Sequence, residues 1–203
     1  MKIICIGRNY AAHAAELNNP LPDKPVIFLK PDTALLKNNS TFYYPDFSKD
    51  IHYECELVFR VCKEGKHIAE KFAMNYVDKI SVGIDFTARD LQDDCKAKGL
   101  PWERAKAFDA SAVIGDMIEL KEIKNVDDIE FSFYQNAKKV QHSNSNLMLF
   151  NLPRLIAEIS SFITLKQGDL IYTGTPVGVG AIAIGDTLKG FIGDKELLTC
   201  YVK

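Results

Sequence analysis

Three acidic residues offer the clearest chemistry in this sequence. Glu54 and Glu56 flank Cys55, and Asp85 follows a separate apolar run. Successive side chains of a strand point to opposite faces, so an extended chain places both glutamates on one face. Two neighbouring carboxylates repel each other unless a positive group lies between them. With a third carboxylate from another strand end they would form an oxygen cage for Mg²⁺ or Mn²⁺. The plainer interpretation is a solvated strand face with alternating acids.

His13 and Glu16 form a second candidate pair. They are three residues apart, so on a helix they face the same way. A carboxylate beside an imidazole orients the ring and raises its basicity, which suits a general base for water. On spacing alone, an ordinary surface pair is the commoner explanation.

Two lysines and one glycine-rich turn could contact a ligand. Lys106 at the edge of an apolar segment could donate to a developing oxyanion or enolate, and Lys30 closes another apolar run. Both also fit surface lysines whose ammonium groups reach solvent. The glycines of residues 173–180 would allow a ligand close to backbone N–H groups, although a plain turn has the same composition.

The elements that must position these residues are mostly short strands. Apolar runs separated by proline and glycine predict strands at 1–7, 26–29, 57–61, 80–84, 129–134, 170–172, 188–192 and 197–202. Helices are expected at 10–17, at 88–98 between an N-cap Thr87 and a terminal Gly99, and at 152–162. Many short strands with few helices predict a mainly β fold with minor α: a sandwich, roll or barrel.

The composition excludes several classes of protein. The chain has 203 residues, 47% apolar and 26% charged, as is usual for one soluble globular domain. With a formal charge of −2, the chain has no excess positive charge that would attract nucleic acid or an anionic membrane. No apolar run is long enough to span a bilayer, and the N-terminus turns polar too quickly for a signal peptide. Five scattered cysteines without a CxxC pair indicate a reduced, cytoplasmic protein.

The order of the motifs is more specific than any one of them. The chain carries, in sequence, Gly7-Arg8-Asn9-Tyr10-x-x-His13-x-x-Glu16, Phe28-Leu29-Lys30-Pro31, Glu54-x-Glu56-Leu57, Asp85-x-Thr87-Ala88-Arg89-Asp90-x-Gln92, Lys106-x-Phe108-Asp109 and Thr173-Gly174-Thr175-Pro176-x-Gly178-Val179-Gly180. This run, from about residue 6 to residue 190, resembles the fumarylacetoacetate hydrolase family. It looks most like the short branch that includes acylpyruvase and oxaloacetate decarboxylase enzymes.

The resemblance implies a fold, an assembly and roles for individual residues. It implies a mixed β-sandwich roll with the active site between sheets, in a single catalytic domain over 1–203, and a homodimer. Segment 8–20 would be a mobile lid that orders over bound ligand. The implied metal ligands for Mg²⁺ or Mn²⁺ are Glu54, Glu56 and Asp85; the catalytic residues are His13, Glu16 and Lys106; and the substrate-binding residues are Arg8, Lys30, Arg89, Gln92 and Thr175.

The implied substrates are small 2-oxo acids or their enols, and three reactions share one pyruvate enolate. They are hydrolysis of 3-acylpyruvate-type 2,4-dioxo acids such as fumarylpyruvate or acetylpyruvate, decarboxylation of oxaloacetate, and isomerisation or tautomerisation of 2-hydroxy-diene-dioates. The His13–Glu16 pair favours hydrolysis, because activating water is the step that most needs a base. A metal-binding β-sandwich module is the non-enzymatic alternative, and it gives no role to His13 or Lys106.

Overall fold

The computed structural model describes residues 1–16 and 20–203, and its largest element is an eight-stranded sheet. The strand order is β2-β1-β13-β6-β7-β9-β3, and β10 pairs with β7. The strands are β1 (Ile3–Gly7), β2 (Val26–Lys30), β3 (Leu35–Lys37), β6 (Cys55–Val61), β7 (Val77–Asp85), β9 (Ala112–Ile114), β10 (Ile118–Glu119) and β13 (Leu170–Tyr172).

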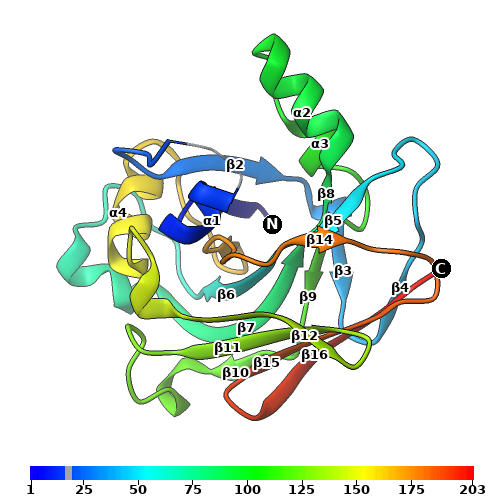
Figure 1. The fold of residues 1–203 in the computed structure, drawn as a ribbon. Helices are drawn as coiled ribbons and strands as arrows, with labels where there is room; N and C mark the ends of the chain where they lie inside the picture. The colour runs from blue at the N-terminus through cyan, green and yellow to red at the C-terminus, as the bar shows by residue number, and fades with distance from the viewer. Residues whose placement is uncertain (17–19) are drawn as a thin grey trace.

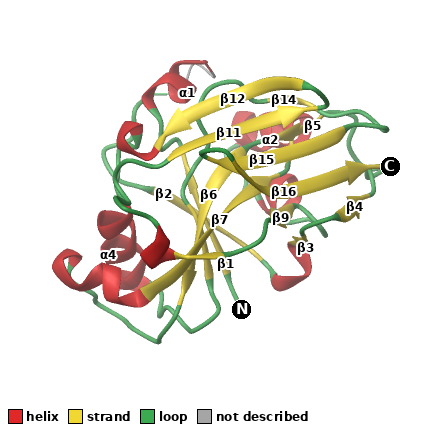
Figure 2. Ribbon diagram, turned by 90° about the horizontal axis from the view of Figure 1, so that it is seen from below, coloured by secondary structure: helices red, strands yellow, loops and turns green. Residues whose placement is uncertain are grey.

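A five-stranded sheet lies across this sheet, as Figure 2 shows. Its order is β12-β11-β15-β16-β4, with β4 (Ser40–Phe42), β11 (Glu130–Gln135), β12 (Lys138–Asn144), β15 (Thr187–Ile192) and β16 (Lys195–Val202). A small third sheet has the order β14-β5-β8, with β5 (Ile51–Tyr53), β8 (Thr87–Ala88) and β14 (Gly180–Ala181).

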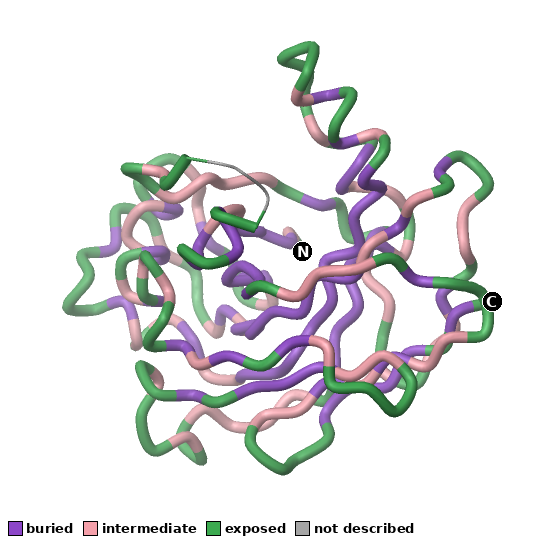
Figure 3. The backbone as a smooth tube through the Cα atoms, in the orientation of Figure 1, coloured by how far each residue is buried: buried purple, intermediate pink, exposed green. Residues whose placement is uncertain are grey.

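The main core lies between the two large sheets. Val82 on β7, Phe133 on β11 and Leu198 on β16 are all fully buried in it. Each such side chain contributes roughly 1.5–3 kcal/mol through its burial. Gly190 on β15 lets the sheets approach closely, because a Cβ there would lie 2.7 Å from Val82 Cγ1. Figure 3 shows the resulting buried centre, with exposed backbone confined mostly to the turns and the projecting helix.

The helices lie outside the sheets. They are α1 (Ala11–Glu16), α2 (Arg89–Lys98), α3 (Glu103–Lys106) and α4 (Leu152–Phe162), with short 3₁₀ turns η1 (Asp32–Ala34), η2 (Glu70–Tyr76), η3 (Leu120–Glu122) and η4 (Ser145–Leu147). The α2 and α3 helices project from the body, whereas α1 lies close to the sheets (Figure 1). Among the described residues, no helix has the length and apolarity needed to cross a membrane.

These elements confirm the mainly β fold that the sequence predicts. Every expected strand is present, with boundaries shifted by a few residues at most, and α4 spans the expected 152–162. The first helix covers 11–16 of the expected 10–17, since Leu17 lies outside the described residues. The expected lid, 8–20, likewise includes residues 17–19, which the structure does not describe.

The prediction that Thr87 caps α2 is wrong. The N-cap residue is Ala88, and no side chain caps this end of the helix. The Thr87 hydroxyl instead accepts a hydrogen bond from Lys106 Nζ at 2.6 Å. The expected end of α2 is correct, because Gly99 there has a φ of 64°, a conformation that glycine adopts at little cost.

Candidate active site

The antiparallel pairing of β6 with β7 brings the three acidic residues together. Glu54 precedes β6, Glu56 lies within it and Asp85 ends β7. Cys55 is opposite Ile84 in the register, and the Asp85 N–H donates to the Glu54 carbonyl oxygen at 2.8 Å. One oxygen from each of the three buried carboxylates lies within 4.8 Å of the other two. This all-oxygen cluster fits a hard divalent cation, which accepts three carboxylates and keeps further positions open.

Two buried lysines balance part of this negative charge. Lys106 Nζ donates to Glu54 Oε2 at 2.8 Å and to Asp85 Oδ2 at 2.7 Å. Lys30 Nζ lies 2.6 Å from Asp85 Oδ1, although the contact lacks the alignment of a hydrogen bond. That buried oxygen therefore keeps lone pairs for another cation, as a metal ligand must.

The first turn of α2 adds an arginine to the cluster. Arg89 Nη2 donates to Glu54 Oε1 at 2.6 Å, and its Nη1 donates to Gln92 Oε1 at 2.6 Å. Arg89 is 7% exposed, and its Nε has no acceptor among the described residues. An open donor on a buried guanidinium is suited to an anionic ligand, because an unpaired buried donor is costly.

The acids differ in their electrostatic environment. Burial alone would raise the pKa of Glu54, but the charges of Lys106 and Arg89 outweigh burial and hold that pKa well below its usual range. Burial, together with the charges of Asp85 and Glu54, raises the pKa of Glu56 well above its usual range. Burial lowers the pKa of Lys106, but Asp85 and Glu54 outweigh it and the pKa is raised. Glu56 is thus the carboxylate that most lacks a positive partner.

The helix α1 places the predicted base beside the acids. His13 Nδ1 lies 3.0 Å from Glu16 Oε2, and Glu16 Oε1 accepts a hydrogen bond from the Gly178 N–H at 3.0 Å. An ionised carboxylate only accepts hydrogen bonds, so we assign the proton of the neutral imidazole to Nδ1. The other ring nitrogen, Nε2, then remains available to accept a proton.

The glycine-rich turn contacts the acids through its backbone. The Gly174 N–H donates to Glu56 Oε2 at 2.7 Å, and Gly174 has a φ of 98°. A side chain there would collide with Asn9, because a Cβ would lie 2.7 Å from Asn9 Cβ. The next residue, Thr175, accepts a hydrogen bond from Gln141 Nε2 at 2.9 Å. The turn therefore orients the Glu56 carboxylate through its backbone and carries the Thr175 hydroxyl, which Gln141 holds in place.

One cavity unites most of the predicted site residues. Its lining includes Arg8, His13, Glu54, Glu56, Asp85, Arg89, Gln92, Lys106 and Thr175. Glu16 and Lys30 do not line it, but they contact His13 and Asp85 respectively. The structure thus brings these residues together, and the role of each one stays a prediction.

The sequence analysis missed several residues of this site. Phe28, Lys96 and Trp102 also line the cavity, while Thr87 and Gln141 hold Lys106 and Thr175. The spacing of Arg89, Gln92 and Lys96 on one helical face could have indicated Lys96. Gln141 lies on a strand far along the chain, and nothing in its local sequence marks it.

Comparison with known proteins identifies the family of this chain. The family description "Fumarylacetoacetate (FAA) hydrolase C-terminal" matches residues 2–203. The chain therefore belongs to the fumarylacetoacetate hydrolase family, and the predicted resemblance is confirmed.

Relatives within this family act on small oxo acids, as their names state. The mitochondrial oxaloacetate tautomerase of Arabidopsis thaliana is 41% identical over 97% of this chain and 88% of its own length. A mitochondrial oxaloacetate decarboxylase of Dictyostelium discoideum is 42% identical over 93% of this chain and 87% of its own. The crystal structure of a fumarylpyruvate hydrolase from Pseudomonas aeruginosa with Mn²⁺ and pyruvate superposes with a TM-score of 0.93, at 35% identity, over 100% of this chain and 89% of that one.

Proposed function

We propose that this chain is a divalent-metal-dependent enzyme that interconverts the enol and keto forms of oxaloacetate. The observation that carries the proposal is a buried three-carboxylate cluster whose cavity also presents cationic side chains, because this combination suits a chelating, doubly charged 2-oxo acid. Relatives named oxaloacetate tautomerase, at 41% identity over 97% of the chain, support the choice of substrate.

This proposal replaces acylpyruvate hydrolysis as the preferred reaction. The sequence analysis favoured hydrolysis because the His13–Glu16 pair suits a base for water. The names of the relatives favour oxaloacetate instead. The same pair serves tautomerisation equally well, since proton removal from carbon also requires a base.

The residues of this chain supply the proton transfers. In the keto-to-enol direction, the C3–H bond breaks and His13 Nε2 takes the proton. The released electron pair forms the C2=C3 double bond, and the C2 oxygen receives a proton from the Lys106 ammonium group. Glu16 stabilises the imidazolium that forms, because its carboxylate lies 3.0 Å from Nδ1. The reverse steps convert the enol to the keto form, starting from the His13 imidazolium and a neutral Lys106, and proton exchange with solvent resets both groups after each turnover.

The carboxylate cluster would hold the metal that these steps need. Glu54, Glu56 and Asp85 each offer one oxygen to a Mg²⁺ or Mn²⁺ ion, and when bound the ion supplies Lewis-acid polarisation of the 2-oxo group. Arg89 and Thr175 line the same cavity and can donate to substrate oxygens.

Decarboxylation of oxaloacetate is the second candidate. The relative from Dictyostelium discoideum, 42% identical over 93% of this chain, is named an oxaloacetate decarboxylase. The C3–C4 bond then breaks instead of a C3–H bond, and the same group of donors stabilises charge on the C2 oxygen. His13 is not needed to remove a proton in this version.

The test separates these reactions with one purified protein. Freshly dissolved enol oxaloacetate is added, the loss of its ultraviolet absorbance is followed, and pyruvate release is measured in parallel with oxaloacetate and with fumarylpyruvate. We expect Mg²⁺-dependent loss of the enol, above the rate with Mg²⁺ alone, that EDTA abolishes. Pyruvate release from pre-equilibrated oxaloacetate without faster enol loss would indicate the decarboxylase. Pyruvate release from fumarylpyruvate and not from oxaloacetate would indicate the hydrolase.

We also propose that the chain acts as a homodimer, as the family resemblance implies. The α2–α3 projection and the end of α4 border an open cavity of about 500 Å³ that includes the exposed Leu29, Leu100 and Phe162. Exposed apolar surface of this kind is typical of protein interfaces. Light scattering on the eluting protein tests the proposal, and a mass of one chain would contradict it.

A further inference from the structure

Two cations of the cavity have no close carboxylate partner. Arg89 and Lys106 both pair with Glu54, at 2.6 and 2.8 Å. Arg8 forms no ion pair among the described residues, and Lys96 has only the exposed Asp93, at 4.0 Å. Charge that lines a cavity without a protein counter-ion is available to an anionic ligand.

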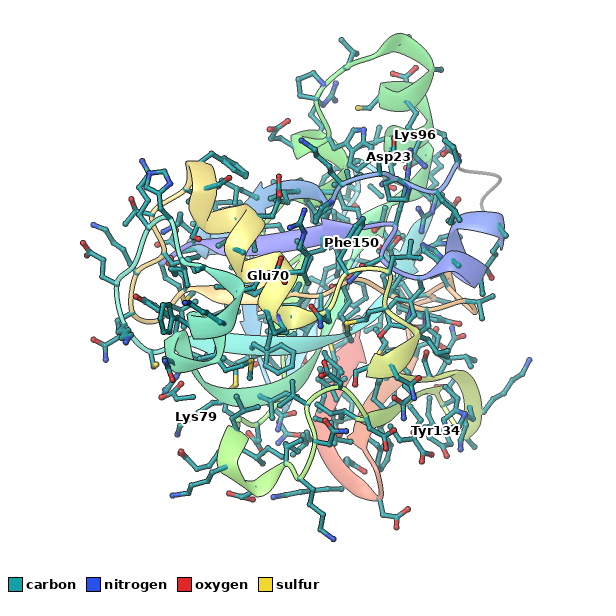
Figure 4. The ribbon with its side chains drawn as sticks, turned by 90° about the vertical axis from the view of Figure 1, so that its left-hand side faces the viewer. Asp23, Glu70, Lys79, Lys96, Tyr134 and Phe150 are labelled. Atoms are coloured by element: carbon teal, nitrogen blue, oxygen red, sulfur yellow. The ribbon has the colours of Figure 1, made fainter. Side chains whose placement is uncertain are left out.

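Lys96 reaches the cavity because of its position on α2. Arg89, Gln92 and Lys96 are spaced i, i+3 and i+7, so they form one line along the helix. Lys96 lies at the outer end of this line, about 10 Å along the helix axis from Arg89, at about 1.5 Å per residue. Figure 4 labels it on the projecting helix. A ligand chelated at the acid cluster could thus extend towards Lys96.

A role in helix stability alone does not account for Lys96. A cation in the last turn of a helix is favourable, and Lys98 occupies that turn as well. However, the Lys96 side chain is 27% exposed, whereas that of Lys98 is 62% exposed and pairs with Asp94 at 2.6 Å. Burial and the neighbouring Arg89 lower the pKa of Lys96, as expected for an ammonium group without a matched anion.

Arg8 lines the same cavity as Lys96, and a fixed turn holds it there. Its φ is 58°, which costs a non-glycine residue roughly 1–2 kcal/mol and persists where the surroundings impose it. The neighbouring Asn9 imposes it, because its buried amide donates to the carbonyl of Thr173 at 2.8 Å and accepts from the Phe150 N–H at 2.9 Å. The Arg8 position is therefore built into the fold.

We propose that Lys96 and Arg8 together bind the distal carboxylate of the substrate and so select dianionic over monoanionic 2-oxo acids. The acid cluster holds the 2-oxo acid end through its metal, and the two cations without carboxylate partners hold the other end. This inference rests on the proposed function, because oxaloacetate carries such a second carboxylate and acetylpyruvate does not.

The test compares two unreactive ligands on the Mn²⁺-loaded protein by calorimetry. Oxamate is a monoanionic chelator, and malate is a dianion with the carbon skeleton of oxaloacetate that has no 2-oxo group and so neither enolises nor decarboxylates. Lys96→Gln should weaken binding of the dianion roughly tenfold, or about 1.4 kcal/mol, and leave oxamate binding unchanged. Lys96→Arg should retain the preference for the dianion. Lys98→Gln is the matched control on the same helix and should change neither constant.

Several outcomes would overturn the assignment. Equal weakening of both ligands in Lys96→Gln would give Lys96 a general structural role, and no change in either would remove it from the site. A wild-type protein that does not prefer the dianion would also refute the proposal. Failure of the proposed function would look different. If wild type leaves oxaloacetate unchanged while Lys96→Gln still alters the preference for the dianion, the carboxylate-binding site is supported and the proposed reaction is wrong.

Discussion

Lys106 Nζ lies 2.7 Å from Asp85 Oδ2, so an ammonium group is bound to a carboxylate of the candidate metal cluster. A second contact, to Glu54 Oε2 at 2.8 Å, repeats the arrangement on another ligand. A divalent cation bound at this cluster would share its carboxylates with the lysine, and each would lower the affinity of the other for them.

This sharing predicts opposite effects of Lys106→Met on metal binding and on turnover. The variant should bind Mn²⁺ more tightly than wild type, because a competing charge is gone, while oxaloacetate turnover falls about 100-fold or more through loss of the proton donor. Mn²⁺ titration followed by magnetic resonance measures the first effect. Lys98→Met serves as the control, and weaker Mn²⁺ binding in Lys106→Met would contradict the shared-ligand arrangement.

Glu56 predicts how stability depends on pH without metal. Its pKa is raised in the folded protein, above the value of about 4.3 in the unfolded chain. Between these two values the native state holds a proton that the unfolded state has lost. Stability of the EDTA-treated protein should therefore fall as pH rises through that window, by up to about 1.4 kcal/mol per pH unit.

The measurement is the melting temperature against pH, for wild type and Glu56→Gln. The variant removes the titrating group, so its curve should be flatter than that of wild type on the alkaline side of the usual carboxyl range. Saturating Mg²⁺ should raise the wild-type melting temperature increasingly with pH, because binding requires the ionised carboxylate. If the two proteins gave parallel curves in EDTA, the fall of the melting temperature with rising pH would not come from Glu56.

His13→Gln should abolish proton transfer and spare the metal. His13 is not a member of the three-carboxylate cluster, so Mn²⁺ affinity should stay within about twofold of wild type. Removing a general base typically costs a factor of about 10²–10⁴ in rate, and enol loss should fall within that range. Equal rates for the two proteins would exclude His13 as the base. Pyruvate release that survives while enol loss disappears would indicate a separate decarboxylation route.

Gln141→Leu should affect both stability and substrate binding. The Gln141 amide donates to Thr175 Oγ1 and to the Pro176 carbonyl, each at 2.9 Å, and accepts from the Cys55 N–H at 3.0 Å. Leaving one of these buried partners unsatisfied costs about 1–3 kcal/mol. We also expect KM to rise, because Thr175 loses the donor that orients its hydroxyl.

A glutamine on the neighbouring strand provides the control for this prediction. Gln135 on β11 bonds to the Ala181 carbonyl and to Asp186, and neither residue lines the candidate site. Gln135→Leu should lower the denaturation midpoint without raising KM. A rise in KM of the same size in both variants would attribute the effect to general loss of stability.

The sequence predicts elements well where apolar residues are periodic and continuous. The helix at 152–162 and the strand at 170–172 match the structure at both ends, because the helix buries one clear apolar face and the strand is a short, wholly buried apolar run. Strand β12 (Lys138–Asn144) was missed, since it is rich in polar residues and lies at a sheet edge. Thr87 looked like a cap, but the distant Lys106 binds its hydroxyl, and such a contact has no local signature.

The candidate site was predictable in parts. Alternation on a strand places Glu54 and Glu56 on one face, whereas the approach of Asp85 depends on the β6–β7 register. That register is a property of the folded sheet, so the sequence offered Asp85 as a third carboxylate without showing that it meets the other two. Neither Lys96 nor Gln141 lies in a family motif: only helical spacing from Arg89 points to Lys96, and only its hydrogen bonds to the glycine-rich turn identify Gln141.

The two oxygens of Glu16 have a consequence for the order of events in a catalytic cycle. One meets the His13 ring and the other accepts the N–H of Gly178, so a single side chain both aligns the base and fastens α1 to the glycine-rich turn. If α1 moved away, the Glu16–Gly178 hydrogen bond would break, and His13 would lose its alignment at the same time. In the proposed reaction His13 would be aligned to abstract a proton only while α1 is held against the glycine-rich turn, so an enolate would form only at a site closed to bulk water.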